Sequence, residues 1–447
     1  MDQAQLSEPV RLDGRKLEGG GQLVRIAVAL SALTGKAVKI DHIRGNRPGK
    51  RGLKVSHLAA ITMLSELSGS TLVGAEVGSC SVEFYPPQTE QGQARRTDSE
   101  INIRLPTPGS VFLVFQPSIL HLCIIGGTNV SSSPSYDYVS QVLLPNFARV
   151  GLPAVSVRLE KRGWASGQRH MGKVIFTVDT LRRENGGLPS HELPSIDLRQ
   201  SQRGSISKID ITILAPDDHL DVTAKGSQQT AAGNTKPGVP KHGVQRNKAV
   251  ESKECEKPET IREFMERYAH QSLRKRLEGL PPAVFPRYSP AEPDLEIVPI
   301  KPHTTEATLR RSCMYVLIVA HTSTRFKIGR DALYGSVREQ PKPRKRQSKQ
   351  EMADRVKGLV DECVENFFRE LCDPLLQKTP DAVGNIGHQP CVDEYMRDQL
   401  VVFEALARVS RSNEAGPQDI ESREDERYWS LHTKTAQWVC QEMFGEG

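Results

Sequence analysis

The chain has 447 residues, with 60 basic and 54 acidic side chains and a formal net charge of +6. This length predicts two or three domains with an ample apolar core, and the mild positive charge permits a polyanionic partner without requiring one. No apolar run approaches the roughly 18 residues that a membrane span requires, and the polar start MDQAQLSEPV does not resemble a secretory signal. We therefore expect a soluble, intracellular protein with no membrane partner.

The eight cysteines form no CxxC pair and lie mostly among apolar neighbours. This pattern is typical of small buried hydrophobic side chains in a reducing compartment. We expect no structural zinc.

Two successive stretches of about 80 residues repeat one order of predicted elements: strand, helix, strand, helix, strand, strand. In the first stretch the elements are 10–14, 22–34, 37–43, 53–67, 71–77 and 81–86. In the second they are 101–106, a helix near 108–117, 119–125, 135–150, 154–159 and 172–179. The repeat predicts an α/β fold (α+β) in which neighbouring units bury each other's sheets.

A third unit is expected to begin with a strand at 205–215 and then to be interrupted. Residues 216–257 are too polar to offset the entropy of ordering them, which predicts a disordered loop. We expect a small α/β domain at 258–380, with helices at 258–279 and 351–373 and strands around 294–300, 314–323 and 325–331. The main domain would comprise 1–215 and 381–447, the latter with helices at 391–408 and from near His432.

The basic run PKPRKRQSK at 341–349 lies between the last predicted strand and helix of this insertion. It predicts a nuclear-targeting or RNA-facing patch, with a solvated linker as the equally weighted alternative. The first interpretation places the protein in the nucleoplasm, with the cytoplasm as a second location.

The segment LEGGGQLVR, 17–25, joins a predicted strand to a predicted helix. Gly20 and Gly21 would let the backbone approach an anion, and the helix N-terminus would supply amide donors. Glu18 is a candidate metal ligand and Arg25 a candidate anion contact. A plain tight turn is the alternative.

Five cations fall within HIRGNRPGKRGLK, 42–54, among them Arg44 and Arg47. Their mutual repulsion favours a phosphate-rich ligand, with a solvated surface as the alternative.

Two further stretches suit a nucleoside. GGTNVSSSPSYDY, 126–138, is a glycine turn in which Pro134 offers a flat apolar wall. VDEYMRDQL, 392–400, opens a helix and places Tyr395, Asp398 and Gln399 within about one turn of each other. Taken alone, these residues equally suit a turn and a solvent-facing helix.

In WSLHTKTAQWVCQEMF, 429–444, His432 lies one turn before a stripe of Ala436, Val439 and Met443. Taken alone, a histidine at the edge of an apolar stripe is more often a hydrogen-bonded boundary residue than a functional one.

Together these stretches resemble the RNA 3′-terminal phosphate cyclase family. The resemblance depends on eight motifs that occur in the family's order over most of 10–215 and 314–445. They are LEGGGQLVR, IRGNRPGKRGLKVSHL, GAEVGS, PGSVFLVFQ, GGTN, TSTRFKIG, VDEYMRDQLVVFEALA and LHTKTA.

The resemblance implies three βαβαββ units with a smaller α/β domain inserted in the third. It also implies a ligase that uses ATP to convert an RNA 3′-phosphate into a 2′,3′-cyclic phosphodiester, releasing AMP and diphosphate. His432 resembles the nucleophile that accepts AMP. The remaining residues that match the family's site are Glu18 for Mg²⁺ or Mn²⁺, Arg25, Arg44 and Arg47 for phosphates, Pro134 and Tyr395 around the adenine, and Gln116, Asp398 and Gln399 as other nucleotide contacts.

This mechanism is chemically consistent. An unprotonated imidazole at a helix N-terminus can attack the α-phosphorus of ATP, while a divalent ion and arginines stabilise the departing diphosphate. Cyclisation needs a vicinal 2′-hydroxyl, so the partner would be an RNA that ends in a 3′-phosphate.

The chain also departs from the family. GWASGQRHMG, 163–172, lacks the family's glycine run, about ten residues are missing after Gln116, and the family continues for two strands beyond the position of Gly447. These departures keep open a non-catalytic, cyclase-like ribosome-biogenesis factor. An enolpyruvyl-type transferase, which shares the repeat unit, fits less well because it needs neither the histidine nor the five cations.

Overall fold

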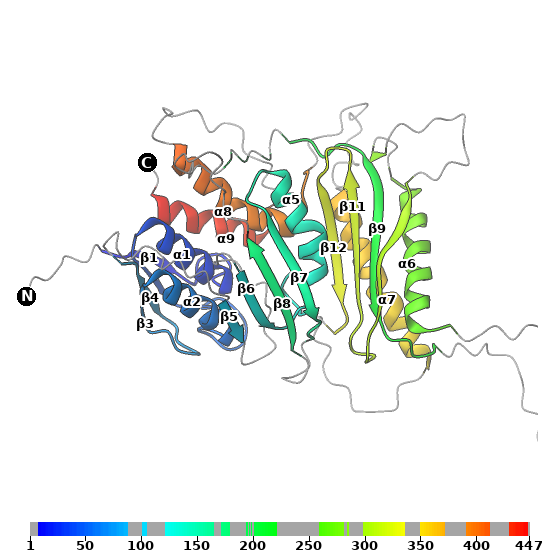
Figure 1. Cartoon of the computed structure of the whole chain (residues 1–447), viewed down its shortest axis with the longest axis horizontal. Coiled ribbons are helices and arrows are strands. Elements are labelled where there is room, and N and C mark those ends of the chain that lie inside the picture. The colour runs from blue at the N-terminus through cyan, green and yellow to red at the C-terminus, as the bar shows by residue number, and fades with distance from the viewer. Residues whose placement is uncertain are drawn as a thin grey trace, which may run out of the picture.

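The computed structural model describes residues 8–87, 101–104, 121–164, 171–178, 201–220, 259–280, 284–285, 298–335, 349–371, 390–411 and 429–445, and positions 194, 196 and 198. Within these ranges the protein is an α/β structure with three four-stranded sheets, which follow one another along its long axis (Figure 1). No helix in the described ranges is long and apolar enough to cross a membrane.

The first sheet confirms the element order predicted for the first unit. Its strands β1 (Val10–Asp13), β2 (Val38–Asp41), β4 (Val82–Tyr85) and β3 (Thr71–Val73) are adjacent in that order. β1 and β2 are parallel and the other pairs are antiparallel. The connections contain α1 (Gly21–Thr34) and α2 (Val55–Ser68), and each helix ends at a left-handed glycine.

The second sheet repeats this arrangement. Its order is β5 (Ile101–Arg104), β6 (His121–Gly126), β8 (Gly172–Val178) and β7 (Val155–Lys161), again with one parallel pair followed by two antiparallel pairs. The helix predicted near 108–117, and Gln116 with it, lies outside the described residues.

The helix predicted at 135–150 is interrupted. It consists of α4 (Tyr136–Tyr138), a π-helical turn η2 (Val139–Leu143) and α5 (Leu144–Arg149). Leu144 donates its N–H to the carbonyl of Val139, and Pro145, which has no N–H to give, follows directly. The wider turn changes which side chains face inward, and such π-helical turns occur frequently at functional sites.

The third sheet has a different order, β10 (Ile300–Ala307), β9 (Ile206–Ala215), β11 (Tyr315–Thr322) and β12 (Lys327–Leu333). β9, which we expected to open the third repeat unit, pairs with strands that we expected in the inserted domain. α6 (Ile261–Leu277) and α7 (Lys349–Leu371) pack on this sheet (Figure 1). The third repeat unit and the proposed domain limits therefore stay predictions.

Residues 294–297 of the strand predicted around 294–300 lie outside the described residues, and the strand that the structure has here, β10, begins at Ile300 and continues to Ala307. Its sequence, IKPHTTEA, lacks an apolar alternation, and most of its side chains are exposed or half-buried. β10 is an edge strand held by backbone pairing with β9, so apolar periodicity could not locate it. The predicted loop at 216–257 and the basic run at 341–349 lie almost entirely outside the described residues, so disorder and nuclear location stay predictions.

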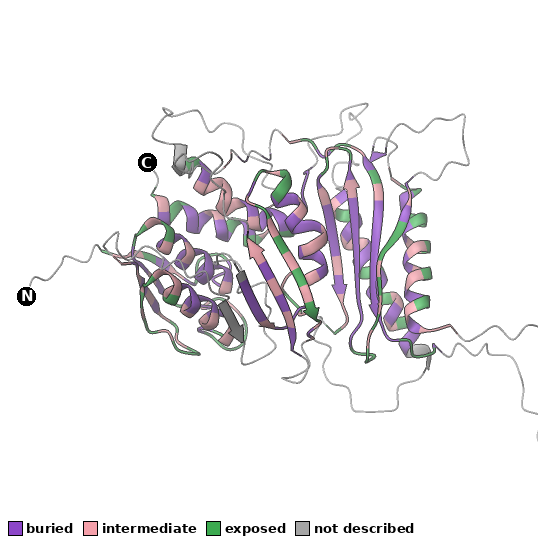
Figure 2. Cartoon of the chain, viewed as in Figure 1, coloured by how far each residue is buried: buried purple, intermediate pink, exposed green. Residues whose placement is uncertain are grey.

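Three apolar clusters form the core, and buried residues line the inner faces of the sheets and helices (Figure 2). One cluster joins the third sheet to α6 and α7, and another joins the second sheet to α5 and to α8 (Glu394–Arg411). The third joins the first sheet to α1, α2 and α9 (Leu431–Phe444). The stripe predicted on α9 is confirmed, since Ala436, Val439 and Met443 are 0 % exposed. Burying side chains such as these contributes about 1.5–3 kcal/mol each, and it fixes α9 against α1.

Candidate functional site

A cavity of about 610 Å³ brings together nearly all of the predicted site residues that the structure describes. It lies where α1, α2, the loop before α4, β11, β12 and the starts of α8 and α9 meet. The predicted residues that line it are Glu18, Gly21, Arg25, Arg44, Arg47, Pro134, Tyr395, Asp398, Gln399 and His432. Gly20 precedes the lining residue Gly21 directly, as the N-cap of α1.

The N-terminus of α1 opens into this cavity. Gly20 has extended backbone and no side chain caps the helix, so its first amides remain available for an anion. A Cβ atom on Gly21 would fall 2.1 Å from Nε2 of His57, which explains why glycine stands there. Because Gly21 has no side chain, the His57 ring and the N-terminus of α1 can lie side by side at the cavity. The predicted anion-binding role of the glycine segment stays a prediction.

The cationic loop folds against the glycine segment. Arg44 donates its backbone N–H to the carbonyl of Gly19 at 2.8 Å, and its Nε donates to the carbonyl of Lys50 at 3.2 Å. Arg47 forms an ion pair with Glu18. Burial lowers the pKa of Arg25 to about 10 and also lowers the pKa of Arg47. Three guanidinium groups thus line one cavity, where an anion would relieve their repulsion.

His432 is the second residue of α9, whose N-cap Ser430 accepts a hydrogen bond from the backbone N–H of Thr433. Its Nδ1 lies 2.9 Å from Oε1 of Gln22 and 3.3 Å from Oε2 of Glu18. Because an amide oxygen only accepts, we assign the ring proton to Nδ1, which leaves the lone pair on Nε2. The His432 side chain is 49 % exposed.

Burial lowers the pKa of His432, against the opposing charge of Asp398, and the positive charge of Arg47 lowers it further. Both changes favour the neutral ring near pH 7. A neutral imidazole with an exposed lone pair is the form that can act as a nucleophile.

Asp398 connects α8 to the start of α9. Its Oδ1 accepts hydrogen bonds from the hydroxyls of Ser430, at 2.7 Å, and of Thr433. Burial raises the pKa of this carboxyl group, while the two hydroxyl donors oppose the increase. Asp398 therefore holds the first turn of α9, and with it His432, at the edge of the cavity.

Tyr395 and Pro134 both line the cavity, as the nucleoside prediction requires. The Arg330 guanidinium lies 4.2 Å from the centroid of the Tyr395 ring, and the Tyr138 ring meets it edge-on. Burial raises the pKa of Tyr395 to about 12, yet the residue is 38 % exposed. Arg330 and Tyr138 thus contact the Tyr395 ring, and the exposed part of the ring remains accessible for stacking.

The described residues contain no group of three or more His, Cys, Asp or Glu side chains that could hold a metal ion. Glu18 is 6 % exposed, and its Oε2 is buried without a hydrogen bond. A single such carboxylate fits Mg²⁺, which commonly takes one or two carboxylates and fills its other positions with water and phosphate oxygens. The metal role of Glu18 stays a prediction.

The structure adds residues that sequence reasoning missed. Gln22 contacts His432 from 410 positions away, and Tyr315 and Asp331 form part of the cavity floor. His57 lies beside Gly21, and burial together with nearby cations, first Arg25, lowers its pKa to about 3. A sequence signal existed for Gln22, directly after the glycines, and for His57, which follows the cationic loop. None existed for Tyr315 or Asp331, which lie on ordinary strands.

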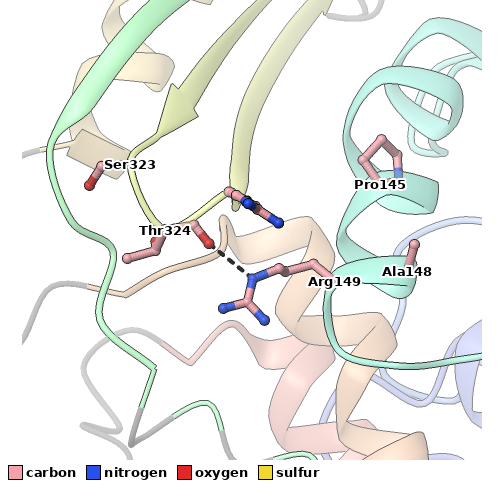
Figure 3. Close-up of a pocket in the computed structure, with 6 residues that line it drawn as sticks. Pro145, Ala148, Arg149, Ser323 and Thr324 are labelled. Atoms are coloured by element: carbon pink, nitrogen blue, oxygen red, sulfur yellow. Dashed lines mark hydrogen bonds between the residues drawn. The ribbon is translucent and has the colours of Figure 1, made fainter.

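A second cavity, of about 680 Å³, lies between α5 and the turn that joins β11 to β12 (Figure 3). Figure 3 shows Arg149 reaching to the backbone of Thr324, where its Nε donates to the carbonyl oxygen at 2.9 Å. None of the predicted site residues that the structure describes lines this cavity. Those residues are gathered at the first cavity instead.

Comparison with known proteins agrees with this geometry. Residues 16–446 match the protein family described as "RNA 3'-terminal phosphate cyclase". Proteins of that name are similar to this chain in Thermococcus onnurineus (42 % identity over 159 residues, 34 % of this chain and 44 % of the relative) and Methylococcus capsulatus (37 % over 172 residues, 35 % and 45 %). The protein of that name from Korarchaeum cryptofilum is 37 % identical over 192 residues, 40 % of this chain and 53 % of the relative. The chain thus spans about half the length of the curated relatives that it matches.

Proposed function

Because the chain belongs to the RNA 3′-terminal phosphate cyclase family, we propose that it uses ATP to convert an RNA 3′-phosphate into a 2′,3′-cyclic phosphodiester. The reaction proceeds through a covalent bond between His432 and AMP, and it releases AMP and diphosphate. The observation that carries this proposal is the hydrogen bond between Nδ1 of His432 and Oε1 of Gln22, in the cavity that also contains the three arginines.

In the first step, Nε2 of His432 attacks the α-phosphorus of ATP. A nitrogen–phosphorus bond forms, the bond from the α-phosphorus to the bridging oxygen breaks, and diphosphate leaves with the electron pair. The hydrogen bond from Nδ1 to Oε1 of Gln22 supports this step, because it directs the reactive lone pair to Nε2.

The charge of the leaving group develops near the N-terminus of α1 and the side chains of Arg25, Arg44 and Arg47. Donors fixed before the reaction stabilise such charge without the cost of reorganisation. Glu18 would hold a Mg²⁺ or Mn²⁺ ion, which supplies further neutralisation of the diphosphate when bound.

In the second step, an oxygen of the RNA 3′-phosphate attacks the phosphorus bound to His432. The bond between Nε2 and phosphorus breaks, its electron pair returns to the ring, and AMP is thereby transferred to the RNA end. In the third, the vicinal 2′-hydroxyl attacks the 3′-phosphorus, loses its proton to solvent and expels AMP. DNA lacks this hydroxyl, so the substrate is RNA.

Pro134 and Tyr395 enclose the adenine, while Asp398 and Gln399 contact the nucleotide from α8. The partly exposed Tyr395 ring, backed by Arg330, supports the stacking role. Gln116, also expected at the nucleotide, lies outside the described residues.

The test is adenylylation of the full chain with ATP labelled at the α-phosphate and Mg²⁺ or Mn²⁺ present. We expect an acid-labile radioactive adduct on the wild-type protein and none on His432→Ala. His303→Ala is the matched control, because His303 is exposed on β10 away from the cavity, and it should be labelled normally.

Absence of label on the folded wild-type protein, or persistence of label on His432→Ala, would overturn the proposed mechanism. Unlabelled protein that sediments with pre-ribosomal particles would instead favour the non-catalytic alternative. A second assay, cyclisation of a 3′-phosphorylated oligoribonucleotide and of its 2′-deoxy-terminated analogue, tests the substrate class. Only the first should react.

A further inference from the structure

Asp331 of β12 occupies a defined position on the floor of the site cavity. The Tyr315 hydroxyl of the neighbouring strand donates to Oδ2 of Asp331 at 2.9 Å, and it also shares a hydrogen bond with Ser135. Ser135 directly follows Pro134, and all four residues line the cavity. A short hydrogen-bonded chain thus connects the carboxylate to the wall where Pro134 stands.

The same carboxylate lies near the opposite wall. The negative charge of Asp331 is, after burial, the largest cause of the raised pKa of Tyr395. Asp331, Pro134 and Tyr395 therefore line one cavity, and the Asp331 carboxylate is connected to the Pro134 side of it through Tyr315 and Ser135. Asp398, a predicted nucleotide contact, is instead hydrogen bonded to the start of α9.

We propose that Asp331 accepts a hydrogen bond from the 6-amino group of the purine and thereby selects adenine over 6-oxopurines. This inference rests on the proposed function, because it takes the cavity to be the ATP site. It adds a specificity-determining residue that the sequence motifs do not contain.

The chemistry of the two partners supports this assignment. An ionised carboxylate only accepts hydrogen bonds, and the exocyclic amine of adenine only donates them. Hypoxanthine and guanine have a carbonyl oxygen at the same position. This oxygen and the Asp331 carboxylate are both hydrogen-bond acceptors, so neither could donate to the other and the carboxylate would lose its partner.

The protonation state is compatible with this role. Burial raises the pKa of Asp331 to about 6, while its hydrogen bond from Tyr315 opposes the increase. At pH 8 the group is therefore ionised and can act as an acceptor. Assays at this pH measure the ionised form.

The experiment compares ATP with inosine triphosphate, in which a 6-oxo group and a protonated N1 replace the 6-amino group and the unprotonated N1 of adenine. Nucleotidyl transfer to the full chain is followed at pH 8 in separate reactions, each with one of the two nucleotides labelled at the α-phosphate. We expect the wild-type protein to prefer ATP by at least about 100-fold in kcat/KM. In Asp331→Asn the ratio should fall to within about tenfold, because an amide can present either a donor or an acceptor.

Two further variants make the test specific. Tyr315→Phe removes the hydroxyl that positions Asp331, so it should also lower the ratio, though less than Asp331→Asn does. Asp361→Asn, the same substitution on the exposed face of α7, should keep the wild-type ratio.

The outcomes separate the two proposals. If wild-type protein forms no adduct with either nucleotide, the proposed function fails and this inference with it. If wild-type protein reacts with ATP but Asp331→Asn loses activity toward both nucleotides by the same factor, Asp331 is structural and only this inference is overturned. An unchanged ratio in both Asp331→Asn and Tyr315→Phe overturns it as well.

Discussion

Nδ1 of His432 lies 2.9 Å from Oε1 of Gln22, and this contact joins the first turn of α9 to the first turn of α1. It determines which ring nitrogen carries the proton. The neutral ring without Gln22 would divide its proton between the two nitrogens, and only one tautomer exposes the lone pair on Nε2.

We therefore expect Gln22→Ala to slow formation of the His432 adduct by about tenfold or more, as measured in single-turnover labelling with saturating ATP. Gln271→Ala, the same change at an exposed position of α6, should leave the rate unaltered. A wild-type rate in Gln22→Ala would show that the contact does not orient the nucleophile.

His57 should make the protein lose stability in mild acid. Its pKa is about 3 in the folded protein, because of burial and the charges of Arg25, Lys54, Arg44 and Arg47, against 6.5 in a model peptide. Below pH 6.5 the unfolded chain therefore binds a proton that the folded protein does not, so stability decreases as the pH falls. The loss attributable to His57 is about 2 kcal/mol at pH 5.

Urea unfolding at pH 7 and pH 5 measures this loss. His57→Asn removes the titrating ring, so its stability should decrease less between the two pH values than that of the wild-type protein. His303→Asn, at an exposed position, should keep the wild-type pH dependence. An equal decrease in His57→Asn and the wild type would rule out His57 as the cause.

Gly21 and Gly358 offer a matched pair of glycine substitutions within helices. Alanine at position 21 would place Cβ 2.1 Å from Nε2 of His57, so the ring must move into the cavity, whereas nothing lies within 4 Å of the corresponding atom at position 358. We expect Gly21→Ala to weaken ATP binding by about tenfold or more, because it disturbs the anion-binding terminus of α1. Gly358→Ala should leave binding unchanged and raise stability by about 0.5–1 kcal/mol.

Isothermal titration with ATP and urea unfolding measure the two effects. Comparable ATP affinity in both variants would indicate that the N-terminus of α1 does not contact the phosphates.

The sequence predicted those elements whose apolar side chains repeat with the period of the element and are buried in the folded protein. The apolar stripe of α9 is buried as expected, and the elements of the first unit follow in the predicted order. Apolar periodicity did not locate β10, because that edge strand is polar. At 136–149 it correctly predicted a helix, but no apolar period marks the π-helical turn that lies before Pro145.

The predicted site residues came from motifs, and their supporting partners did not. Asp331 and Tyr315 carry ordinary strand residue types, and their importance arises from the pairing of β11 with β12, which places both side chains in the cavity. Contacts of this kind depend on strand register, which is a property of the folded protein.

The contact between His432 and Gln22 also has a consequence for the order of synthesis. A ribosome makes the glycine segment, α1 and the cationic loop early, whereas His432 of α9 follows Gln22 by 410 residues. The first sheet can pair its strands long before that, but an apolar face of α1 must wait for Val439 and Met443 to cover it. A nascent chain therefore carries the glycine segment and the cationic loop without His432 until α9 has been made.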